Sequence, residues 1–322
     1  KSQIVFKKIR TKLNKDLSNK LSQRYDAFEK FHKEHFKVSR EYKSWDDLRT
    51  GCKDYTSVVV GSDQLWLPSN IAGDYYTLSF VPNEVNKVAY ATSFGVSKIA
   101  KGQEEQAKNF LSRIDYLSAR EESGQKIIKE TTGRDVQLVC DPALLLTAEE
   151  WDEDATPGRI IEDRYIFCYF MGDNPWQRDF VKKLKEKTGY KIIALLHLDQ
   201  YIKTDENYVD YAPYDISPAD FINLVKNSEI VCTDSFHGTV FSLTYGKKFF
   251  TFMRFSEKAT LSTNSRITTL LKRLEVEDRL VCRESNVEDM LSKVIDAEGI
   301  KERLELFRKE SLNYLTTALE HK

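Results

Sequence analysis

Cysteine is scarce in this sequence, and its spacing suggests neither disulfides nor a metal centre. The 322 residues include five cysteines, and no two of them form a CxxC pair. Three of the five lie in apolar runs, which is typical of buried thiols in a reducing compartment. No cluster of His, Cys or Asp has the spacing of metal ligands. We therefore predict a protein with no disulfide and no metal.

Long hydrophobic segments and targeting signals are missing as well. The densest apolar stretches, such as residues 165–171, have the length of a strand, whereas a membrane-spanning helix needs about 20 apolar residues. Since no signal peptide is recognisable, the pattern predicts a cytoplasmic protein. The first residue is Lys1 rather than a methionine, which leaves open whether other residues precede it.

The common nucleotide, hydrolase and nucleic-acid motifs are also absent. No GxGxxG follows a predicted strand and no GxxxxGK[ST] occurs, which argues against dinucleotide and triphosphate sites. No GxSxG elbow is present. Because no helix-turn-helix or RNP motif accompanies the basic residues, we predict no nucleic-acid partner.

What the sequence does contain is a large apolar and aromatic fraction. Apolar residues make up 41% of the chain, with 18 Phe, 16 Tyr and 4 Trp, and side chains of this kind need a buried core. The length suggests about two domains of ordinary size. The 49 basic and 50 acidic residues nearly cancel, but residues 1–40 hold 12 Lys and Arg against 4 Asp and Glu.

The basic segment 1–40 also carries an apolar stripe at three- and four-residue steps, which predicts an amphipathic helix. The stripe is formed by Ile9, Leu13, Leu17, Leu21, Tyr25 and Phe28. One interpretation is a helix docked on the protein with its basic face in solvent. The other is a helix that contacts an anionic membrane surface or an anionic acceptor.

After residue 50, short β-rich runs alternate with helical patterns, which is typical of parallel sheets covered on both faces by helices. The predicted strands are 56–60, 87–92, 114–119, 136–140, 165–170, 191–196, 229–233 and 248–252. The acidic segment 147–163 contains Pro-Gly and lacks strand periodicity, which marks a domain boundary. We predict an α/β protein with two Rossmann-like, doubly wound domains and an interdomain cleft. The predicted parts are a helical lead-in at 1–40, a first domain at 41–150, a second at 151–285 and terminal helices at 286–322.

The residues that follow the predicted strands are unusually polar, and many of them can carry a charge. In open α/β sheets, ligands bind beyond the carboxyl ends of the strands, so these positions are the first candidates for a site. They include Ser62, Asp63, Ser93, Arg120, Glu121, Asp141, Asp173, His197, Asp234, Ser235, His237, Gly238 and Arg254.

His237 is the sharpest of these candidates. It follows a predicted strand and opens a helix of small residues, with Asp234 or Ser235 available as the cap. The start of a helix offers free N–H groups and a positive dipole end to an anion. An imidazole there titrates near neutral pH and can transfer protons to a bound ligand. The alternative is a histidine hydrogen-bonded within its turn, and for His197 we prefer that alternative.

Several arginines, lysines and aspartates could bind or activate such a ligand. Arginine suits carboxylate and phosphate groups, and a ligand with two anionic groups needs at least two cations. The basic candidates are Arg120, Lys247, Lys248, Arg254 and Arg266. Each could instead form a surface ion pair, although Arg120 and Arg254 stand directly after strands. Asp63 and Asp141 could be bases or could orient a hydroxyl group, or they could cap loops.

Two blocks of the sequence are more specific than the rest, VVVGSDQLW at 58–66 and VCTDSFHGTVFSLTYGKKFF at 231–250. Weaker blocks are ATSFGVS at 91–97, YLSARE with SGQKIIKETTG within 116–133, CDPALLL at 140–146 and NSRITTLLKRL at 264–274. With these blocks the chain resembles the polysaccharide pyruvyl transferase family, over residues 20 to 280 or so.

The resemblance implies a GT-B-like fold and an activity. The activity is transfer of the pyruvyl group of phosphoenolpyruvate onto two hydroxyls of a sugar, which forms a ketal and releases phosphate. His237 matches the catalytic histidine of the family, and Arg120 matches an arginine of the phosphoenolpyruvate site. We take His237 and Asp63 as catalytic residues. The predicted substrate-binding residues are Ser62, Ser93, Arg120, Ser235, Gly238, Lys247, Arg254, Asn264 and Arg266.

The chain departs from the family pattern in two respects. Many members carry an arginine two residues before the histidine, where this chain has Ser235. Members also open with a strand and an Asn-Tyr-Gly-rich loop that helps to shape the acceptor site, and the sequence here shows neither. Arg254 or Arg266 are the candidates to replace the absent arginine.

The predicted function is therefore a pyruvyl transferase that acts on a cell-surface polysaccharide, such as a capsule or exopolysaccharide, or on its lipid-linked precursor. It needs phosphoenolpyruvate as donor but no cofactor, and residues 1–40 could bring it to the inner face of the membrane. Two alternatives remain at this point. One is a GT-B glycosyltransferase that uses a nucleotide sugar, and the other is a non-catalytic binding protein of a polysaccharide assembly complex.

Overall fold

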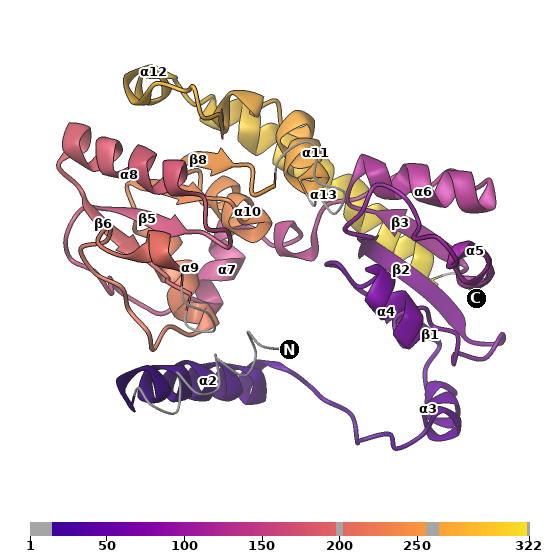
Figure 1. Ribbon diagram of the computed structural model, residues 1–322. Coiled ribbons are helices and arrows are strands. Elements are labelled where there is room, and N and C mark those ends of the chain that lie inside the picture. Colours follow the sequence, from indigo (N-terminus) through magenta and orange to yellow (C-terminus); the bar gives the residue numbers. More distant parts are fainter. Residues whose placement is uncertain (1–14, 198–201, 256–263, 321–322) are drawn as a thin grey trace. The chain divides into compact units, whose positions relative to one another are not determined.

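The computed structural model describes residues 15–197, 202–255 and 264–320, and they form two compact units (Figure 1). The first, the β1–β4 unit, comprises residues 39–146, 255–277 and 298–322. The second, the β5–β9 unit, comprises residues 1–38, 147–254 and 278–297. In the described part of the chain, no helix combines the length and the hydrophobicity needed to span a membrane.

The β1–β4 unit is built on a parallel sheet with the strand order β1-β2-β3-β4. Since all pairs are parallel, the carboxyl ends of the strands lie at one edge of the sheet. The strands are Ser57–Val60, Asn86–Thr92, Tyr116–Ala119 and Gln137–Leu138. The helices are α3 Trp45–Cys52, α4 Pro68–Gly73, α5 Glu104–Arg113, α6 Glu122–Thr132, α11 Ser265–Arg273 and α13 Ala297–Glu320.

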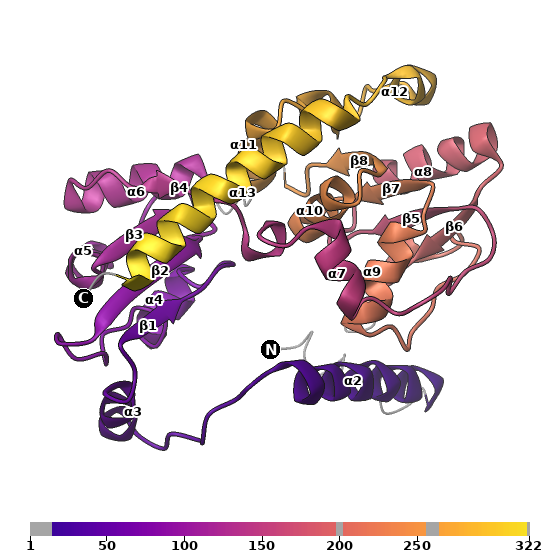
Figure 2. The same ribbon diagram turned by 180° about the vertical axis from the view of Figure 1, so that it is seen from behind.

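Helices cover both faces of this sheet. On one face Phe110 of α5 and Ile127 of α6 belong to a core that also contains Trp66. On the other face α13 packs Tyr314 against Tyr90 of β2, and Figure 2 shows this long helix lying across the strands. The unit therefore has the two-sided covering that a parallel sheet requires.

The β5–β9 unit contains a second parallel sheet, with the order β6-β5-β7-β8-β9. The order reverses between β5 and β7, which is the switch point where open α/β sheets bind ligands. The strands are Tyr165–Tyr169, Lys191–Ala194, Ile230–Thr233, Lys248–Phe252 and Leu280–Val281. The helices are α2 Lys15–His35, α7 Ala148–Asp154, α8 Pro175–Thr188, α9 Pro218–Lys226, α10 Phe236–Thr244 and α12 Val287–Ser292.

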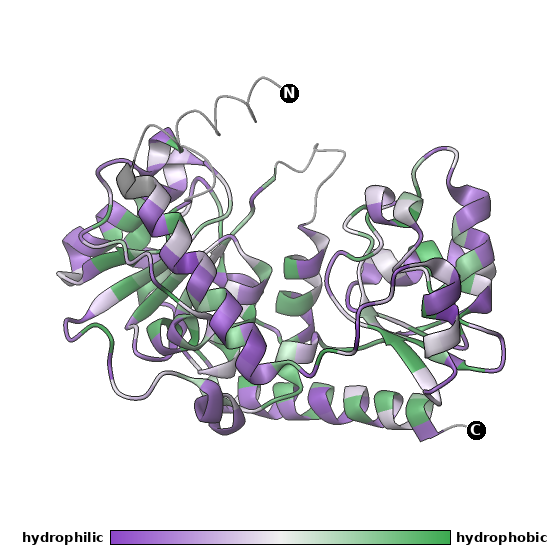
Figure 3. Ribbon diagram, turned by 90° about the horizontal axis from the view of Figure 1, so that it is seen from below, coloured by the Kyte–Doolittle hydropathy of each residue, from purple (hydrophilic) through white to green (hydrophobic). Residues whose placement is uncertain are grey.

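Aromatic contacts attach the helices to both faces of this sheet. Phe180 of α8 lies against Phe250 and Phe252 of β8, whereas Phe221 of α9 meets Phe167 of β5. In Figure 3 the strands are largely green, the hydrophobic colour, while helices such as α13 alternate green and purple. All eight strands predicted from the sequence are present within a few residues of their expected bounds, and among the described residues only β9 was not predicted.

The two units are not continuous in the sequence, which differs from the linear domains expected above. The chain leaves the β1–β4 unit at Leu146, returns for 255–277 and returns again at Glu298. Contacts between residues far apart in the sequence explain this, since Ser265 of α11 bonds to Ser123 and the Cys140 N–H bonds to Ser311 of α13. A domain prediction based on strand counting cannot detect such returns.

Helix α2 is attached to the β5–β9 unit through basic residues. The Lys20 ammonium lies 4.0 Å from the ring centroid of Tyr214, and Arg24 Nε donates to Tyr214 O over 3.3 Å. Tyr25 and Phe28, in the predicted apolar stripe, are 67% and 52% exposed. The helix is therefore docked, but not with these apolar residues inward. Ile9 and Leu13 of the stripe lie outside the described residues.

Candidate functional site

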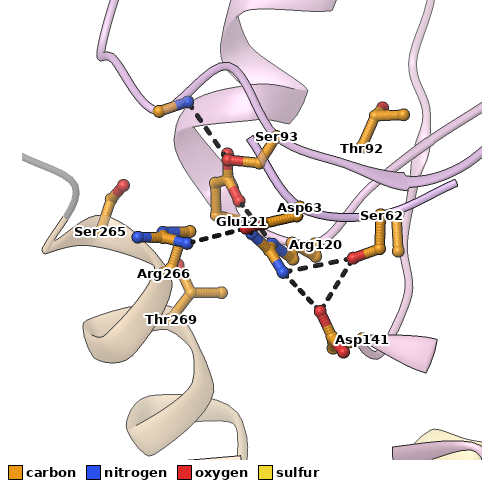
Figure 4. A network of polar contacts seen from close by, with 12 residues as sticks. Ser62, Asp63, Thr92, Ser93, Arg120, Glu121, Asp141, Ser265, Arg266 and Thr269 are labelled. Carbon is orange, nitrogen blue, oxygen red and sulfur yellow. Dashed lines mark hydrogen bonds and ion pairs between the residues drawn. The ribbon is translucent and has the colours of Figure 1, made fainter. Parts of the chain in front are cut away.

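Polar side chains gather where the strands β1, β2, β3 and β4 end. The group, called the Arg120 cluster here, consists of Ser62, Asp63, Ser93, Arg120, Glu121, Asp141 and Arg266 (Figure 4). Ser62, Asp63, Ser93, Arg120 and Arg266 were predicted as site residues from the sequence. The structure brings these five together: Ser62, Asp63, Ser93 and Arg120 follow parallel strands whose carboxyl ends share one edge of the sheet. Arg266 comes from α11.

Arg120, the first residue after β3, bonds to residues that follow β1 and β4. Its Nη2 donates to Asp63 Oδ1 over 2.8 Å, and its Nη1 donates to Asp141 Oδ2 and to Ser62 Oγ over 3.2 Å. Ser62 Oγ donates in turn to Asp141 Oδ2 over 2.8 Å. The Nε of Arg120 lies 3.7 Å from Glu121 Oε2. One guanidinium thus connects three strand ends.

Burial sets the electrostatics of the cluster. The side chains of Arg120 and Glu121 are each 1% exposed and that of Asp141 is 3% exposed, whereas that of Asp63 is 58% exposed. Burial by itself would lower the pKa of Arg120, but the charges of Asp141, Glu121 and Asp63 raise it above its ordinary value. Burial raises the pKa of Glu121, against the Arg120 charge and a hydrogen bond from Ser93.

Arg266 reaches the cluster from the first turn of α11. The Glu122 N–H at the start of α6 donates to Thr269 Oγ1 over 3.3 Å, which fixes α11 beside the residues that follow β3. Arg266 Nη1 then donates to Asp63 Oδ1 over 3.3 Å. Arg120 and Arg266 therefore contact the same oxygen of Asp63, as Figure 4 shows.

The backbone around the cluster is strained at two non-glycine residues. Asp63 has φ +66° and Ala91 has φ +54°, and such left-handed conformations are unfavourable for residues with a Cβ. At Ala91 the register of β2 against β3 shifts between Ala89 and Thr92. The Ser93 N–H donates to Asp63 O over 3.0 Å, so the two strained segments hold each other. Strain of this kind is found at functional sites more often than elsewhere.

In the β5–β9 unit, His237 stands at the start of α10 directly after β7. From 230 to 243 every residue is buried except His237. Ser235 is the N-cap, and its Oγ accepts the Gly238 N–H over 3.4 Å. A Cβ on Gly238 would lie 2.3 Å from Thr233 Oγ1, so only glycine fits this close approach of α10 to β7. The imidazole is thus the one accessible side chain of an otherwise buried turn.

Asp234 connects this turn to the end of β5 across the switch point. Its Oδ1 accepts the Met171 N–H over 2.6 Å and its Oδ2 accepts the Gly172 N–H over 2.9 Å. Arg254, which follows β8, donates from Nη2 to Asp234 O over 3.2 Å. Burial raises the pKa of Asp234, against the charge of Arg254 and these two N–H groups. Arg254 therefore lies beside the His237 turn, as predicted for a residue after a strand.

Two predicted substrate-binding residues do not belong to either group. Lys247 precedes β8 and its Nζ donates to Lys226 O over 2.9 Å, at the opposite edge of the sheet from His237. Asn264 bonds on both sides to the backbone of Phe255, donating to its O over 2.7 Å and accepting its N–H over 3.4 Å. Lys247 is removed from the predicted site, and Asn264 holds the chain at the start of α11.

Sequence reasoning missed a buried polar group after β6. Arg178 Nη2 donates to Asp205 Oδ1 over 2.6 Å and to Gly172 O over 2.8 Å, and His197 Nδ1 lies 2.7 Å from Asp205 Oδ2. The hydrogen bond with Asp205 raises the pKa of His197. The structural interpretation preferred for His197 agrees with this contact. Arg178, the other partner of Asp205, had only one sequence signal, a charge on the apolar side of α8.

Comparison with known proteins identifies the family. The family model described as Polysaccharide pyruvyl transferase matches residues 4–254, which include both the Arg120 cluster apart from Arg266 and the His237 turn. The chain belongs to the polysaccharide pyruvyl transferase family. Membership indicates a transferase, in agreement with the resemblance noted from the sequence. No curated protein matches the chain.

Solved structures to which this chain is similar include proteins described as UDP-N-acetylglucosamine 2-epimerases. One described as a UDP-N-acetylglucosamine 2-epimerase from Listeria monocytogenes aligns with a TM-score of 0.51 at 10% identity, over 88% of this chain and 83% of the other. The UDP-GlcNAc 2-epimerase of Methanocaldococcus jannaschii aligns with a TM-score of 0.46 at 14% identity, over 84% and 77%. The likeness to the Listeria structure, at 10% identity, shows the fold alone, and it agrees with the GT-B-like fold predicted from the sequence.

Proposed function

We propose that this protein transfers the pyruvyl group of phosphoenolpyruvate to two hydroxyls of a sugar in a cell-surface polysaccharide or its lipid-linked precursor. The observation that carries the proposal is His237, the one accessible side chain in the buried β7–α10 turn. Family membership supports a transferase of this class. The buried Arg120, whose guanidinium faces the ends of three strands, supports an anionic donor.

The chemistry requires a proton donor and a proton acceptor. A proton adds to the methylene carbon of the enol, which becomes a methyl group, and the neighbouring carbon becomes cationic. A sugar hydroxyl bonds to this carbon and loses its proton. When the second hydroxyl bonds to the same carbon and closes the ketal, the carbon–oxygen bond to phosphate breaks. The leaving phosphate takes the electron pair of that bond and the proton of the second hydroxyl.

We assign these steps to residues by their position and chemistry. His237 at the start of α10 transfers a proton, because imidazole titrates near neutral pH. The partly exposed Asp63 takes the hydroxyl proton. Arg120 and Arg266 in the β1–β4 unit, and Arg254 in the β5–β9 unit, are the candidate cations for the carboxylate and phosphate, and charge preorganised within each unit stabilises the transition state. In the described ranges no group of three His, Cys, Asp or Glu side chains could hold a metal ion, and the proposed steps do not call for one.

The lead-in helix supports a further part of the proposal, contact with the inner face of the membrane. Residues 1–40 carry a large excess of basic side chains, and Tyr25 and Phe28 of α2 are exposed. A helix with basic and exposed apolar residues is suited to an anionic lipid surface. A lipid-linked acceptor would be presented at that surface.

The test is release of phosphate from phosphoenolpyruvate with a panel of nitrophenyl and lipid-linked sugars. We expect release only when an acceptor is present. His237→Gln should lower the turnover number by at least about 100-fold, the loss expected when acid–base help is removed, while circular dichroism stays unchanged. His32→Gln, on the exposed surface of α2, is the matched control and should retain full turnover. Full turnover in His237→Gln would remove this residue from the mechanism.

A further inference from the structure

The two positive charges of the Arg120 cluster already face carboxyl groups in the free protein. Arg120 and Arg266 face the carboxyl groups of Asp63, Glu121 and Asp141. A donor that brings its own carboxylate and phosphate would add negative charge to a buried group that has no excess of positive charge. Such a ligand can bind there only if one of the carboxylates withdraws, because unbalanced buried charge is costly.

Two of these carboxylates are fixed. Asp141 Oδ2 accepts from Arg120 and Ser62, and its Oδ1 accepts the Ala143 N–H over 3.0 Å. Glu121 is buried and hydrogen-bonded to Ser93. Withdrawal of either group would break hydrogen bonds and leave polar atoms buried without partners, which costs free energy.

Asp63 differs from both. Its side chain is the exposed one of the three, at 58%, and both arginines contact the same atom, Oδ1. Its backbone is held independently, since Asp63 O accepts the Ser93 N–H. The carboxylate can therefore rotate to another staggered position while the strand end stays in place.

We propose that the Asp63 carboxylate occupies, in the free protein, the seat between Arg120 and Arg266 that an oxyanion group of the donor takes on binding. In the free protein Asp63 thus makes the contacts with Arg120 and Arg266 that the ligand makes when it binds. Arrival of the donor displaces it into solvent, where its carboxylate is free to accept the sugar proton. This inference rests on the proposed function for the identity of the donor, but not for the presence of the seat.

The proposal predicts an unusual combination, tighter donor binding with slower turnover. Asp63→Asn removes the competing charge and suits the left-handed backbone, which asparagine tolerates better than most residues. Each partly exposed ion pair contributes up to about 1 kcal/mol, so the Kd of phosphoenolpyruvate should fall about threefold to tenfold. Turnover should fall at the same time, because the proton acceptor is lost.

The experiment is calorimetric titration of the purified full chain with phosphoenolpyruvate, inorganic phosphate and pyruvate. The last two ligands represent the two anionic groups of the donor and identify which one takes the seat. Asp135→Asn, which removes one exposed negative charge of the same unit, is the control and should leave each Kd unchanged. Asp63→Gly repeats the test with a residue that adopts positive φ freely.

The outcomes separate this inference from the proposed function. In one outcome, phosphate or pyruvate binds Asp63→Asn more tightly than it binds the unchanged protein, but the unchanged protein does not turn over phosphoenolpyruvate. The seat then stands and the proposed donor fails. If phosphoenolpyruvate is turned over by the unchanged protein, yet neither Asp63 variant binds any of the three ligands more tightly, the proposed function stands and the seat is refuted.

Discussion

Arg120 has a structural task as well as the proposed role in binding, and the two can be measured separately. Its guanidinium is nearly inaccessible and contacts Asp63, Asp141 and, more distantly, Glu121. A buried cation of this kind is stable only while its counter-charges stay in place. The stability of the β1–β4 unit should therefore depend on the buried partner Asp141 rather than on the exposed partner Asp63.

Replacement of Asp141 tests this dependence. Removal of one partner from a buried ion pair typically costs about 3–5 kcal/mol, and Asp141→Ala should lie near the lower end because Asp63 and Glu121 still face Arg120. The control is Asp135→Ala, which breaks an exposed pair with Lys129 and should cost less than about 1 kcal/mol. Urea unfolding measures both. Equal losses in the two variants would contradict a structural role for the Arg120–Asp141 pair.

Single site residues were predictable where a strand end and a chargeable side chain coincide. His237, Arg120 and Arg254 follow β7, β3 and β8, and the structure has them at those strand ends. Lys247 was misjudged because it precedes its strand and so lies at the other edge of the sheet. Asp141 was predicted to be either a base or hydroxyl-orienting acceptor or a loop cap. One of its oxygens caps 142–144 and the other binds Arg120, so the cap is confirmed and the catalytic role stays a prediction.

Strand β2 carries the clearest element-scale feature, the irregularity at Ala91. An alanine in the left-handed region costs about 1–2 kcal/mol relative to glycine. At the fully buried Ala91 this relief roughly offsets the chain entropy of glycine and the loss of a buried methyl group, so Ala91→Gly should leave the stability nearly unchanged. Ala89→Gly, in the regular part of the same strand, has no strain to release. It should destabilise the protein by about 1 kcal/mol or more.

Denaturant unfolding of the two glycine variants measures this difference. Ala89→Gly is expected to be clearly less stable than the unchanged protein, and Ala91→Gly is expected to stay close to it. A loss of stability in Ala91→Gly as large as in Ala89→Gly would mean that the backbone at Ala91 is not strained.

Helix α2 gives the second element-scale prediction, attachment to anionic lipid. Tyr25→Ser combined with Phe28→Ser should weaken binding to anionic vesicles at least about tenfold, since burial of each aromatic ring contributes about 1.5–3 kcal/mol. The control is Leu306→Ser with Leu312→Ser, which removes two exposed apolar side chains of α13. Vesicle co-sedimentation is the measurement. Equal binding of the unchanged protein to neutral and anionic vesicles would contradict the proposed attachment.

Elements were predictable when their signal was local. Ser217 caps α9 with Pro218 in its first turn, and Gly133 ends α6 in the left-handed conformation, both as the residue types predict. The sequence indicated residues 264–274 only as a block similar to the family. In the structure, α11 brings Arg266 into the cluster through contacts with the start of α6. Those contacts join residues far apart in the sequence, and no local pattern reports them.

At the scale of the whole molecule, the fold and the family were both accessible from the sequence, whereas the division into units was not. The alternation of strands and helices gave the α/β class, and the blocks at 58–66 and 231–250 gave the family. The returns of the chain at 255–277 and 298–322 depend on packing of α11 and α13, which strand and helix patterns do not encode.

The central claim is that the donor is phosphoenolpyruvate rather than a nucleotide sugar, and thermal unfolding with added ligands tests it most directly. A ligand that binds only the folded protein stabilises it by about 2.7 kcal/mol at a hundredfold excess over Kd, which raises the melting temperature of units of this size by roughly several degrees. We predict this rise with phosphoenolpyruvate, unchanged by EDTA, and no rise with UDP, GDP or CMP. A rise with a nucleotide and none with phosphoenolpyruvate would contradict the account.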